Sequence, residues 1–402
     1  MRDHATQVIK VFFAVLVILF LLMIITSAIP NSWLEENQME AVEILKQEGL
    51  IPRFFFDSES VQLDNYTDLV IIRQALNGEQ DGVLTSAMHP TYARYWHGYS
   101  VLIRPLLVAF SLYQIRYGMM LLFFVLLGTA AILIAKRIDT PSAIAFLAAN
   151  AMAYLLVAAT SLQFFPTFLI SYIAIIVQLL HPDAIRKNHL VFFMLVGMMT
   201  SFIDLLTTPM LTLGLPLIVF LLADHEDASL MGRLKTIVSS SILWGFGYGA
   251  TWASKWLIGS VILRQNVLQN AAETMSFRLM GNEEYSGGLL TDRLHAISVN
   301  AKLMFLSSGR RVAVLLVLVL VILLVIALWR RTRSRQKQLQ AFSVLLVGTF
   351  PYIWYFALAN HSLIHTFFTY RAQAVSVFAL LAFLGRLTEF PDKTTKQELS
   401  HG

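Results

Sequence analysis

Acidic side chains gather shortly after the first apolar stretch of the chain, where Asp57 is followed by residues 63–68 (LDNYTD). Asp64 and Asp68 are four residues apart, so on a helix they share one face. One carboxylate there could accept a proton while the other positions a hydroxyl or a cation. The alternative is that Asp64 caps a helix and the acids face water. We predict catalytic roles for Asp64 and Asp68 and substrate binding for Asp57.

A second cluster, residues 92–99 (YARYWHGY), combines four aromatic residues with an arginine and a histidine and is followed by Arg104. Aromatic rings stack on sugar faces, and arginine binds phosphate through two or more charge-assisted hydrogen bonds. An interfacial aromatic belt is the alternative, but it does not call for the histidine and the second arginine. We predict substrate binding by Tyr95, Trp96, His97 and Arg104.

A third candidate is Asp204, in residues 200–209 (TSFIDLLTTP), at the end of a short apolar run. An acid at membrane depth costs about 2.5–3.5 kcal/mol on insertion scales, so its presence there indicates function. In the headgroup zone the same residue would only cap a helix, and that alternative stays open. We predict a catalytic role for Asp204.

The fourth cluster, residues 360–371 (NHSLIHTFFTYR), opens the last apolar run. His361 and His365 share a helical face, but no glutamate lies between them in an H-E-x-x-H pattern and no third ligand is evident, so no metal site is predicted. We predict that His361, His365 and Arg371 bind phosphate or sugar. Arg371 would lie inside the membrane, where a lipid phosphate or Asp204 would compensate its charge.

The elements that position these clusters are apolar helices. The chain has 402 residues, of which 57% are hydrophobic and 14% charged, whereas soluble domains have about 25% charged residues. Runs of about 18 apolar residues can cross a bilayer, and in lipid they must be helical. The first run is longer than a signal peptide's and no A-x-A site follows, so we expect it to be retained. The ten predicted spans are 8–29, 118–135, 140–160, 162–180, 189–203, 207–223, 236–258, 311–329, 341–359 and 366–385.

Basic flanks decide the predicted orientation. They fall on one face, at 136–137, 186–187, 233–235, 330–337 and 386, and the positive-inside rule makes that face cytoplasmic. Both termini, including a tail over 387–402, are then cytoplasmic, and the segments 31–117 and 260–310 lie outside. The first segment is expected to hold a surface helix over 32–46 and a membrane-dipping stretch over 101–115. The net charge of +5 reflects these flanks and not nucleic-acid binding, and the absence of cysteine excludes disulfides and thiol chemistry.

The long segment after the first helix and the polar clusters on one side resemble the GT-C superfamily of polytopic glycosyltransferases, in particular a bacterial branch. The resemblance is architectural and covers most of the single transmembrane domain, 1–402. It implies an all-α membrane fold whose first outer loop carries interfacial helices and the catalytic acid. The sequence departs from many members, because an acidic pair directly after helix one is replaced by glutamates, with the aspartates further on.

The resemblance implies transfer of a sugar from a polyprenyl-phosphate or diphosphate donor to a glycan, lipid or protein of the cell envelope, outside the cytoplasmic membrane. Displacement by the acceptor hydroxyl, with a loop carboxylate as base, would invert the anomeric centre. No cofactor is required, although a diphosphate donor would favour a divalent cation. The alternatives are a transporter or flippase of lipid-linked sugars, a scaffold for envelope assembly, and a membrane acyl- or lipid-phosphate transferase.

Overall fold

The computed structural model describes residues 2–55, 57–78, 81–223, 229–280, 289–307, 321–322, 324–326 and 335–387. Throughout these residues the secondary structure is helical, and the one β-type contact is an isolated antiparallel bridge between Arg53 and Gln62. The predicted all-α class is therefore confirmed. The span expected at 311–329, the basic run at 330–337 and the tail after Leu387 lie wholly or largely outside the described residues.

Three helical stretches in the described part are long and apolar enough to cross a membrane, namely Thr6–Ser27, Leu112–Arg137 and Thr366–Leu387. They correspond to α1 (Arg2–Ser27), α6 (Leu112–Arg137) and the end of the chain from α20 onward. The other expected spans are shorter apolar helices or fall on broken ones, so the count of ten spans stays a prediction. Membrane insertion is supported by these three helices, whereas the orientation of the termini stays a prediction.

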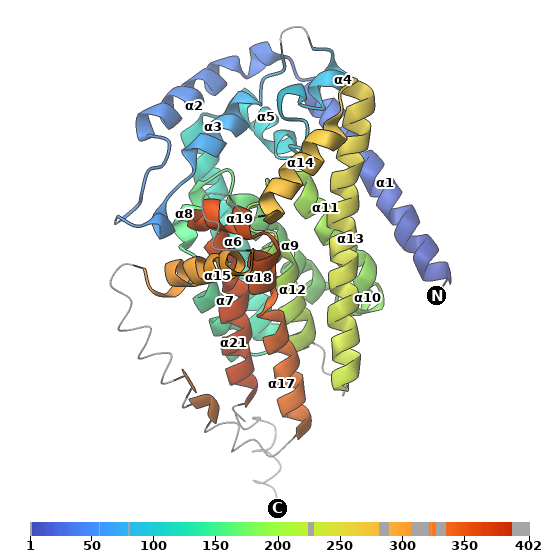
Figure 1. Ribbon diagram of the computed structural model, residues 1–402, viewed down its shortest axis with the longest axis vertical. Coiled ribbons are helices and arrows are strands. Elements are labelled where there is room, and N and C mark those ends of the chain that lie inside the picture. The colour runs from blue at the N-terminus through green and yellow to red at the C-terminus, as the bar shows by residue number, and fades with distance from the viewer. Residues whose placement is uncertain are drawn as a thin grey trace, which may run out of the picture.

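Helices that run along the long axis form the body of the molecule, and a cap of shorter helices covers one end (Figure 1). Besides α1 and α6, the body contains the following helices: α7 (Thr140–Ala151), α8 (Leu155–Thr160), α9 (Phe165–Leu180), α10 (Pro182–Lys187), α11 (His189–Ile203), α12 (Met210–Ala223), α13 (Leu230–Leu263), α17 (Arg335–Val347), α18 (Phe350–Ala357), α20 (Thr366–Thr369), η5 (Tyr370–Gln373) and α21 (Ala374–Leu387). One large apolar core joins most of them.

Close backbone contact fixes α11 against α13. A Cβ atom on Gly197 would lie 2.1 Å from the Trp244 carbonyl oxygen, and one on Gly247 would lie 2.1 Å from that of Met194. Both distances are far below van der Waals contact, so only glycine allows this approach. This packing fixes the position of α13 relative to α11. Residues nearer the C-terminal end of α13 contribute to the candidate site described below.

Two of the expected spans are each divided between two helices, so they stay predictions as membrane spans. The stretch 140–160 divides into α7 and α8, because Tyr154 takes a left-handed conformation with φ 54°. The stretch 341–359 divides between α17 and α18, where Pro351 occupies the first turn of the second helix. Proline lacks the backbone N–H that a helix interior needs, so a new helix begins there.

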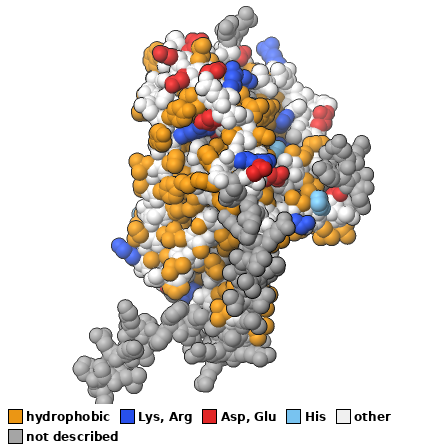
Figure 2. Space-filling model, turned by 90° about the vertical axis from the view of Figure 1, so that its left-hand side faces the viewer, with side chains coloured by type: hydrophobic (Ala, Val, Ile, Leu, Met, Phe, Trp, Pro, Cys, Tyr) orange, Lys and Arg blue, Asp and Glu red, His pale blue; other side chains and the backbone are white. Residues whose placement is uncertain are grey.

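The cap is built from the segment that follows α1. It contains η1 (Asn31–Trp33), α2 (Glu35–Glu48), η2 (Glu59–Val61), α3 (Asn65–Arg73), α4 (Val83–Ser86), η3 (Pro90–Tyr92) and α5 (Ser100–Ala109). The expected surface helix over 32–46 corresponds to α2. The stretch 101–115 contains most of α5 and the start of α6, and its dipping into the membrane stays a prediction. Seen from the side, apolar side chains cover the body, and most of the visible acidic ones lie toward the cap (Figure 2). This division is typical of a membrane protein with a polar cap.

Three more helices lie between the cap and the body, in front in Figure 1: α14 (Val267–Met280), α15 (Leu289–Phe305) and α19 (Ala359–Ile364). The first two come from the second expected outer segment, 260–310, of which residues 281–288 and 308–310 lie outside the described part. The side-chain amide of Asn360 donates to the Phe277 carbonyl at 2.8 Å and ties α19 to α14. Two segments far apart in sequence thus meet at one level.

At the opposite end, basic side chains bind the carbonyl groups that end α12. Arg233 donates to the Leu221 carbonyl at 2.6 Å, and Arg386 donates to the Leu222 carbonyl at 2.7 Å. Arg386 also lies 3.8 Å from the carboxylate of Asp139. Cations stabilise helix C-termini, so two of the basic flanks have a structural role whichever side of a membrane they face.

Candidate functional site: a groove between helices 14 and 19

A cavity of about 430 Å³ lies between α14, α19 and the segment before α5. We call it the α14–α19 groove. It is lined by Arg94, Glu273, Thr274, Phe277, Arg278, His361, Ile364 and His365. The lining joins the second and fourth sequence clusters with the second outer segment. Two guanidinium groups and two imidazoles against one carboxylate make the groove suited to an anion.

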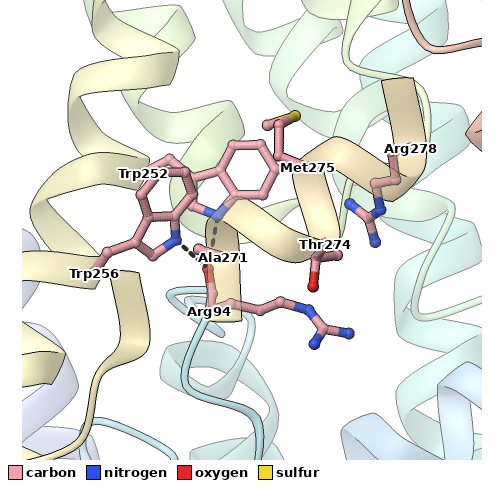
Figure 3. Close-up of a pocket in the computed structure, with 7 residues that line it drawn as sticks. All are labelled: Arg94, Trp252, Trp256, Ala271, Thr274, Met275 and Arg278. Atoms are coloured by element: carbon pink, nitrogen blue, oxygen red, sulfur yellow. Dashed lines mark hydrogen bonds between the residues drawn. The ribbon is translucent and has the colours of Figure 1, made fainter. Parts of the chain in front are cut away.

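Tryptophans of α13 position Arg94 in this groove. The indole N–H groups of Trp252 and Trp256 donate to the Arg94 carbonyl at 2.7 and 2.9 Å. Figure 3 shows both bonds, and it shows the guanidinium groups of Arg94 and Arg278 on either side of the Thr274 hydroxyl. The Arg94 guanidinium also lies 4.4 Å from the centroid of the Tyr92 ring, within cation–π range. Both guanidinium groups therefore lie near Thr274 of α14.

His361, which lines the groove, has one ring nitrogen without a hydrogen-bond partner in the described part of the chain. Its Nε2–H donates to the Leu206 carbonyl at 2.8 Å, so Nδ1 carries the lone pair. Nδ1 is buried and has no hydrogen-bond partner in the described part of the chain. Burial, with the charges of His365 and Arg278, lowers the pKa of His361 well below its usual value. The neutral ring therefore keeps one acceptor nitrogen that no group in the described part of the chain satisfies.

His365 is the second imidazole of the lining. Its ring stacks on Phe368 with centroids 5.0 Å apart, and lies 4.9 Å from the ring of His361. Burial and the charge of Arg278 lower its pKa to about 4. Both histidines are therefore neutral near pH 7, and the positive charge of the groove comes from the arginines.

Glu273 is the carboxylate of the lining, and its position on α14 was not singled out from the sequence. Its Oε1 accepts a hydrogen bond from the side-chain amide of Gln269 at 2.9 Å. The second oxygen leaves capacity for a ligand hydroxyl. Arg278 was not singled out from the sequence either, and Arg94 entered only as a member of the motif 92–99. What distinguishes Glu273, Arg278 and Arg94 from other charged residues is that they lie together in the folded protein. Their spacing along the chain does not reveal this.

Asp204 shapes the turn behind His361. It is the C-cap of α11, is 3% exposed, and accepts from the Thr207 backbone N–H at 2.9 and 3.1 Å. The turn places Leu206 at φ 65° and presents the carbonyl that His361 binds. Burial raises the pKa of Asp204 to about 7. Asp204 is not part of the groove lining, and its contacts support a positioning role.

The aromatic segment 95–97 lies behind the lining. Tyr95 stacks on Trp252 with centroids 5.6 Å apart, and the Arg278 guanidinium lies 5.7 Å from its ring centroid. Trp96 donates to the Thr251 carbonyl at 2.6 Å. Both nitrogens of the His97 ring are engaged, by the Tyr92 carbonyl and the Tyr99 hydroxyl, each at 2.7 Å. Tyr95 thus adjoins the groove, Trp96 fastens the segment to α13, and His97 links Tyr92 to Tyr99 within the segment.

Arg104 and Arg371 bind backbone carbonyls of the protein itself. Arg104 donates to the carbonyls of Thr26, Ile29 and Ala75 and fastens the end of α1 to the cap. Arg371 donates to those of Ala153, Phe367 and Ser60, and lies 4.6 Å from the centroid of the Phe164 ring.

Both guanidinium groups are buried, so these acceptors replace the phosphate expected from the sequence. In the described part, backbone carbonyls compensate the charge of Arg371, and no ion pair joins it to Asp204. Of the two alternatives expected from the sequence, compensation by Asp204 is therefore not seen in this part, and compensation by a lipid phosphate stays a prediction.

The acidic cluster after α1 is separate from the groove. Asp64 is the N-cap of α3 and accepts from the backbone N–H and the hydroxyl of Thr67 at 3.0 and 2.7 Å. Asp68 is fully buried and accepts from the backbone N–H groups of Leu162 and Gln163 at 3.1 and 3.0 Å. The structure therefore gives Asp64 the capping role that the sequence left open and uses Asp68 to hold the turn before α9.

Charges around Asp68 act in opposite directions. Burial raises its pKa to about 7, while Arg116, 3.9 Å away, and the two backbone donors oppose the shift. Arg116 is itself held by the carboxylate of Glu48 at 2.7 and 2.8 Å. Asp57, the third acid of the cluster, is exposed and paired with Arg53. None of the three predicted acids lines the groove.

Among the described residues, no three histidine, aspartate or glutamate side chains gather closely enough to hold a metal ion. Comparisons with protein-family models, curated protein sequences and solved structures find no match to this chain.

Proposed function

We propose that the protein is a membrane glycosyltransferase that takes a sugar from a polyprenyl-phosphate donor bound in the α14–α19 groove. The observation that carries the proposal is the pairing of two arginines with an unpartnered acceptor, His361 Nδ1, along one cavity. Guanidinium groups call for an anion, and an orphaned acceptor calls for a hydroxyl or N–H donor. A sugar phosphate supplies both kinds of group in one molecule.

The roles follow from placement. Arg94 and Arg278 hold the donor phosphate and stabilise the negative charge that grows on it as the bond to the sugar breaks. His361 Nδ1 accepts a hydrogen bond from a sugar hydroxyl. The partly exposed ring of Trp256, which lines the adjoining small cavity, adds apolar surface on which a sugar face can stack.

The proposed reaction is a single displacement. The acceptor hydroxyl attacks the anomeric carbon, its proton passes to the Glu273 carboxylate, and the bond from that carbon to the phosphate oxygen breaks with its electrons going to polyprenyl phosphate. Attack from the face opposite the leaving group inverts the anomeric centre. Glu273 replaces the loop aspartates as the proposed base, because it is the carboxylate of the lining.

The test uses purified protein in nanodiscs and a panel of polyprenyl-phosphate hexoses, with release of polyprenyl phosphate as the readout. We expect Glu273→Gln to slow release by roughly 10²–10⁴-fold, as loss of a general base does. The matched control is Glu40→Gln, a change at an exposed acid of α2.

Full activity of Glu273→Gln would remove Glu273 as the base. Movement of the donor across the bilayer with no bond broken would instead identify the alternative, a transporter of lipid-linked sugars.

A further inference from the structure

Six large apolar or aromatic side chains are exposed in the loop after α2, in the first turn of α3 and at the start of α6. Their exposed fractions are 46% for Leu50, 59% for Ile51, 71% for Phe55, 61% for Tyr66, 47% for Tyr113 and 68% for Tyr117. We call them the outer apolar patch. Contiguous apolar exposure of this kind marks an interaction surface.

The loop part of the patch is held in a defined shape. The Tyr66 N–H donates to the Leu50 carbonyl at 3.1 Å, Leu63 to that of Pro52 at 2.9 Å, and Phe54 to that of Val61 at 3.0 Å. These bonds fold the chain back on itself after α2. Phe55 has φ 67°, a conformation that costs energy for an aromatic residue. The exposure of these side chains is therefore a property of an ordered segment.

A polar clamp fastens the loop to α6. Arg116 binds the Glu48 carboxylate at 2.7 and 2.8 Å and donates to the Asn65 side-chain oxygen at 3.3 Å. Glu48 and Asn65 flank the exposed part of the loop. Tyr113 and Tyr117 lie on α6 either side of Arg116, so the loop and the helix form one continuous surface.

The position along α6 identifies what covers this surface. α6 is long and apolar enough to cross a membrane, and most of its apolar window is exposed. A rise of 1.5 Å per residue places Tyr117 about 30 Å from Arg137, which is one hydrocarbon thickness. Basic residues end the helix at Arg137, and tyrosines begin it. That arrangement places the two tyrosines at a headgroup interface.

We propose that the outer apolar patch rests in the headgroup region of the bilayer, on the side of the membrane that the cap faces. The chain after α2 descends along the body to about the level of α8 and α19 (Figure 1). Headgroups at that level stand beside the α14–α19 groove, so a lipid phosphate reaches Arg94 and Arg278 without leaving the interface.

The experiment uses the absence of native cysteine. Single cysteines at Ile51, Phe55 and Tyr117 are labelled with an environment-sensitive dye, in phosphatidylcholine nanodiscs with and without a headgroup spin label. Met39→Cys is the matched control, because Met39 is apolar and 62% exposed but lies on α2. We expect quenching at 51, 55 and 117 to exceed that at 39 at least about twofold, as immersion in the headgroup layer requires.

Quenching at 51 and 55 no stronger than at 39 would overturn the proposal. Absence of quenching at 117 would also overturn it, because the premise that α6 crosses the bilayer would be wrong. Each labelled variant is first checked for an unchanged unfolding midpoint by tryptophan fluorescence. The readout needs no catalytic activity, so its outcome is independent of the proposed transferase function.

Discussion

The acidic cluster around Asp68 and the α14–α19 groove both gather buried polar side chains from distant segments, but only the groove lies along a cavity. The Asp68 oxygens accept from two backbone N–H groups and from the Ser161 hydroxyl at 3.3 Å. Both regions hold buried atoms without a partner in the described part of the chain: Arg116 Nε and Gln163 Oε1 near Asp68, and His361 Nδ1 and Arg94 Nε at the groove. Only the last two belong to residues that line the groove. Buried polar groups are normally satisfied within the protein, so unmet capacity beside a cavity indicates ligand binding, whereas the presence of acids alone does not.

The largest expected effect tests whether Asp68 has a structural role. Asp68→Ala leaves the buried N–H groups of Leu162 and Gln163 without acceptors and removes an anion beside Arg116. We expect the free energy of unfolding to fall by about 3 kcal/mol. Tryptophan fluorescence during denaturation in detergent measures it. Asp57→Ala, at an exposed acid, should change it by no more than about 0.5 kcal/mol. Equal effects of the two changes would contradict the structural role of Asp68.

Substitutions of the groove arginines test whether the α14–α19 groove binds a ligand. Arg278→Gln and Arg94→Gln should each weaken binding of polyprenyl monophosphate by about 10–100-fold, which is the loss of one charge-assisted hydrogen bond. Quenching of tryptophan fluorescence reports binding, because Trp252 and Trp256 adjoin both arginines. The control is Arg73→Gln, at an exposed arginine of α3. If the control weakened binding as much, the effect would be general electrostatics and not the groove.

The sequence predicted the fold class and several elements well, because apolar runs specify helices directly. The expected helix at 189–203 matches α11 residue for residue. The break between α7 and α8 could not be predicted, since residues 143–159 are apolar except for Asn150 and the break depends on the backbone conformation of Tyr154. Tertiary packing decides that conformation.

For the candidate site, the sequence supplied the segments but not the assignment within them. Residues 92–99 and 360–371 do meet, and His361 and His365 line the groove. Arg104 and Arg371 looked like phosphate ligands because their types and surroundings fit. Their carbonyl acceptors lie in segments far away in sequence, such as Ala153 for Arg371. Hydrogen-bond satisfaction depends on such long-range partners, and spacing along the chain does not reveal them.

The pH dependence of stability tests whether His365 is desolvated at the groove. Its pKa in the folded protein, about 4, lies below the ordinary 6.5, so the unfolded chain binds a proton first as the pH falls. Its contribution to stability is complete above pH 6.5 and is lost as the pH falls toward 4. His365→Phe keeps an aromatic ring on Phe368 and removes the proton site. We expect a smaller drop in unfolding midpoint from pH 7 to pH 4.5 than in the parent protein. An unchanged drop would mean that His365 is not desolvated.

The smallest expected effect separates capping from catalysis at Asp64. Asparagine caps a helix about as well as aspartate, because its side-chain oxygen also accepts the Thr67 N–H, whereas alanine costs about 1 kcal/mol. Asparagine cannot serve as a base, since it has no carboxylate to take a proton. If Asp64 only caps α3, Asp64→Asn retains both the unfolding midpoint and the rate of polyprenyl phosphate release, and Asp64→Ala lowers the midpoint alone. A stable Asp64→Asn protein that releases no polyprenyl phosphate would return catalysis to the loop and leave the groove as a binding site.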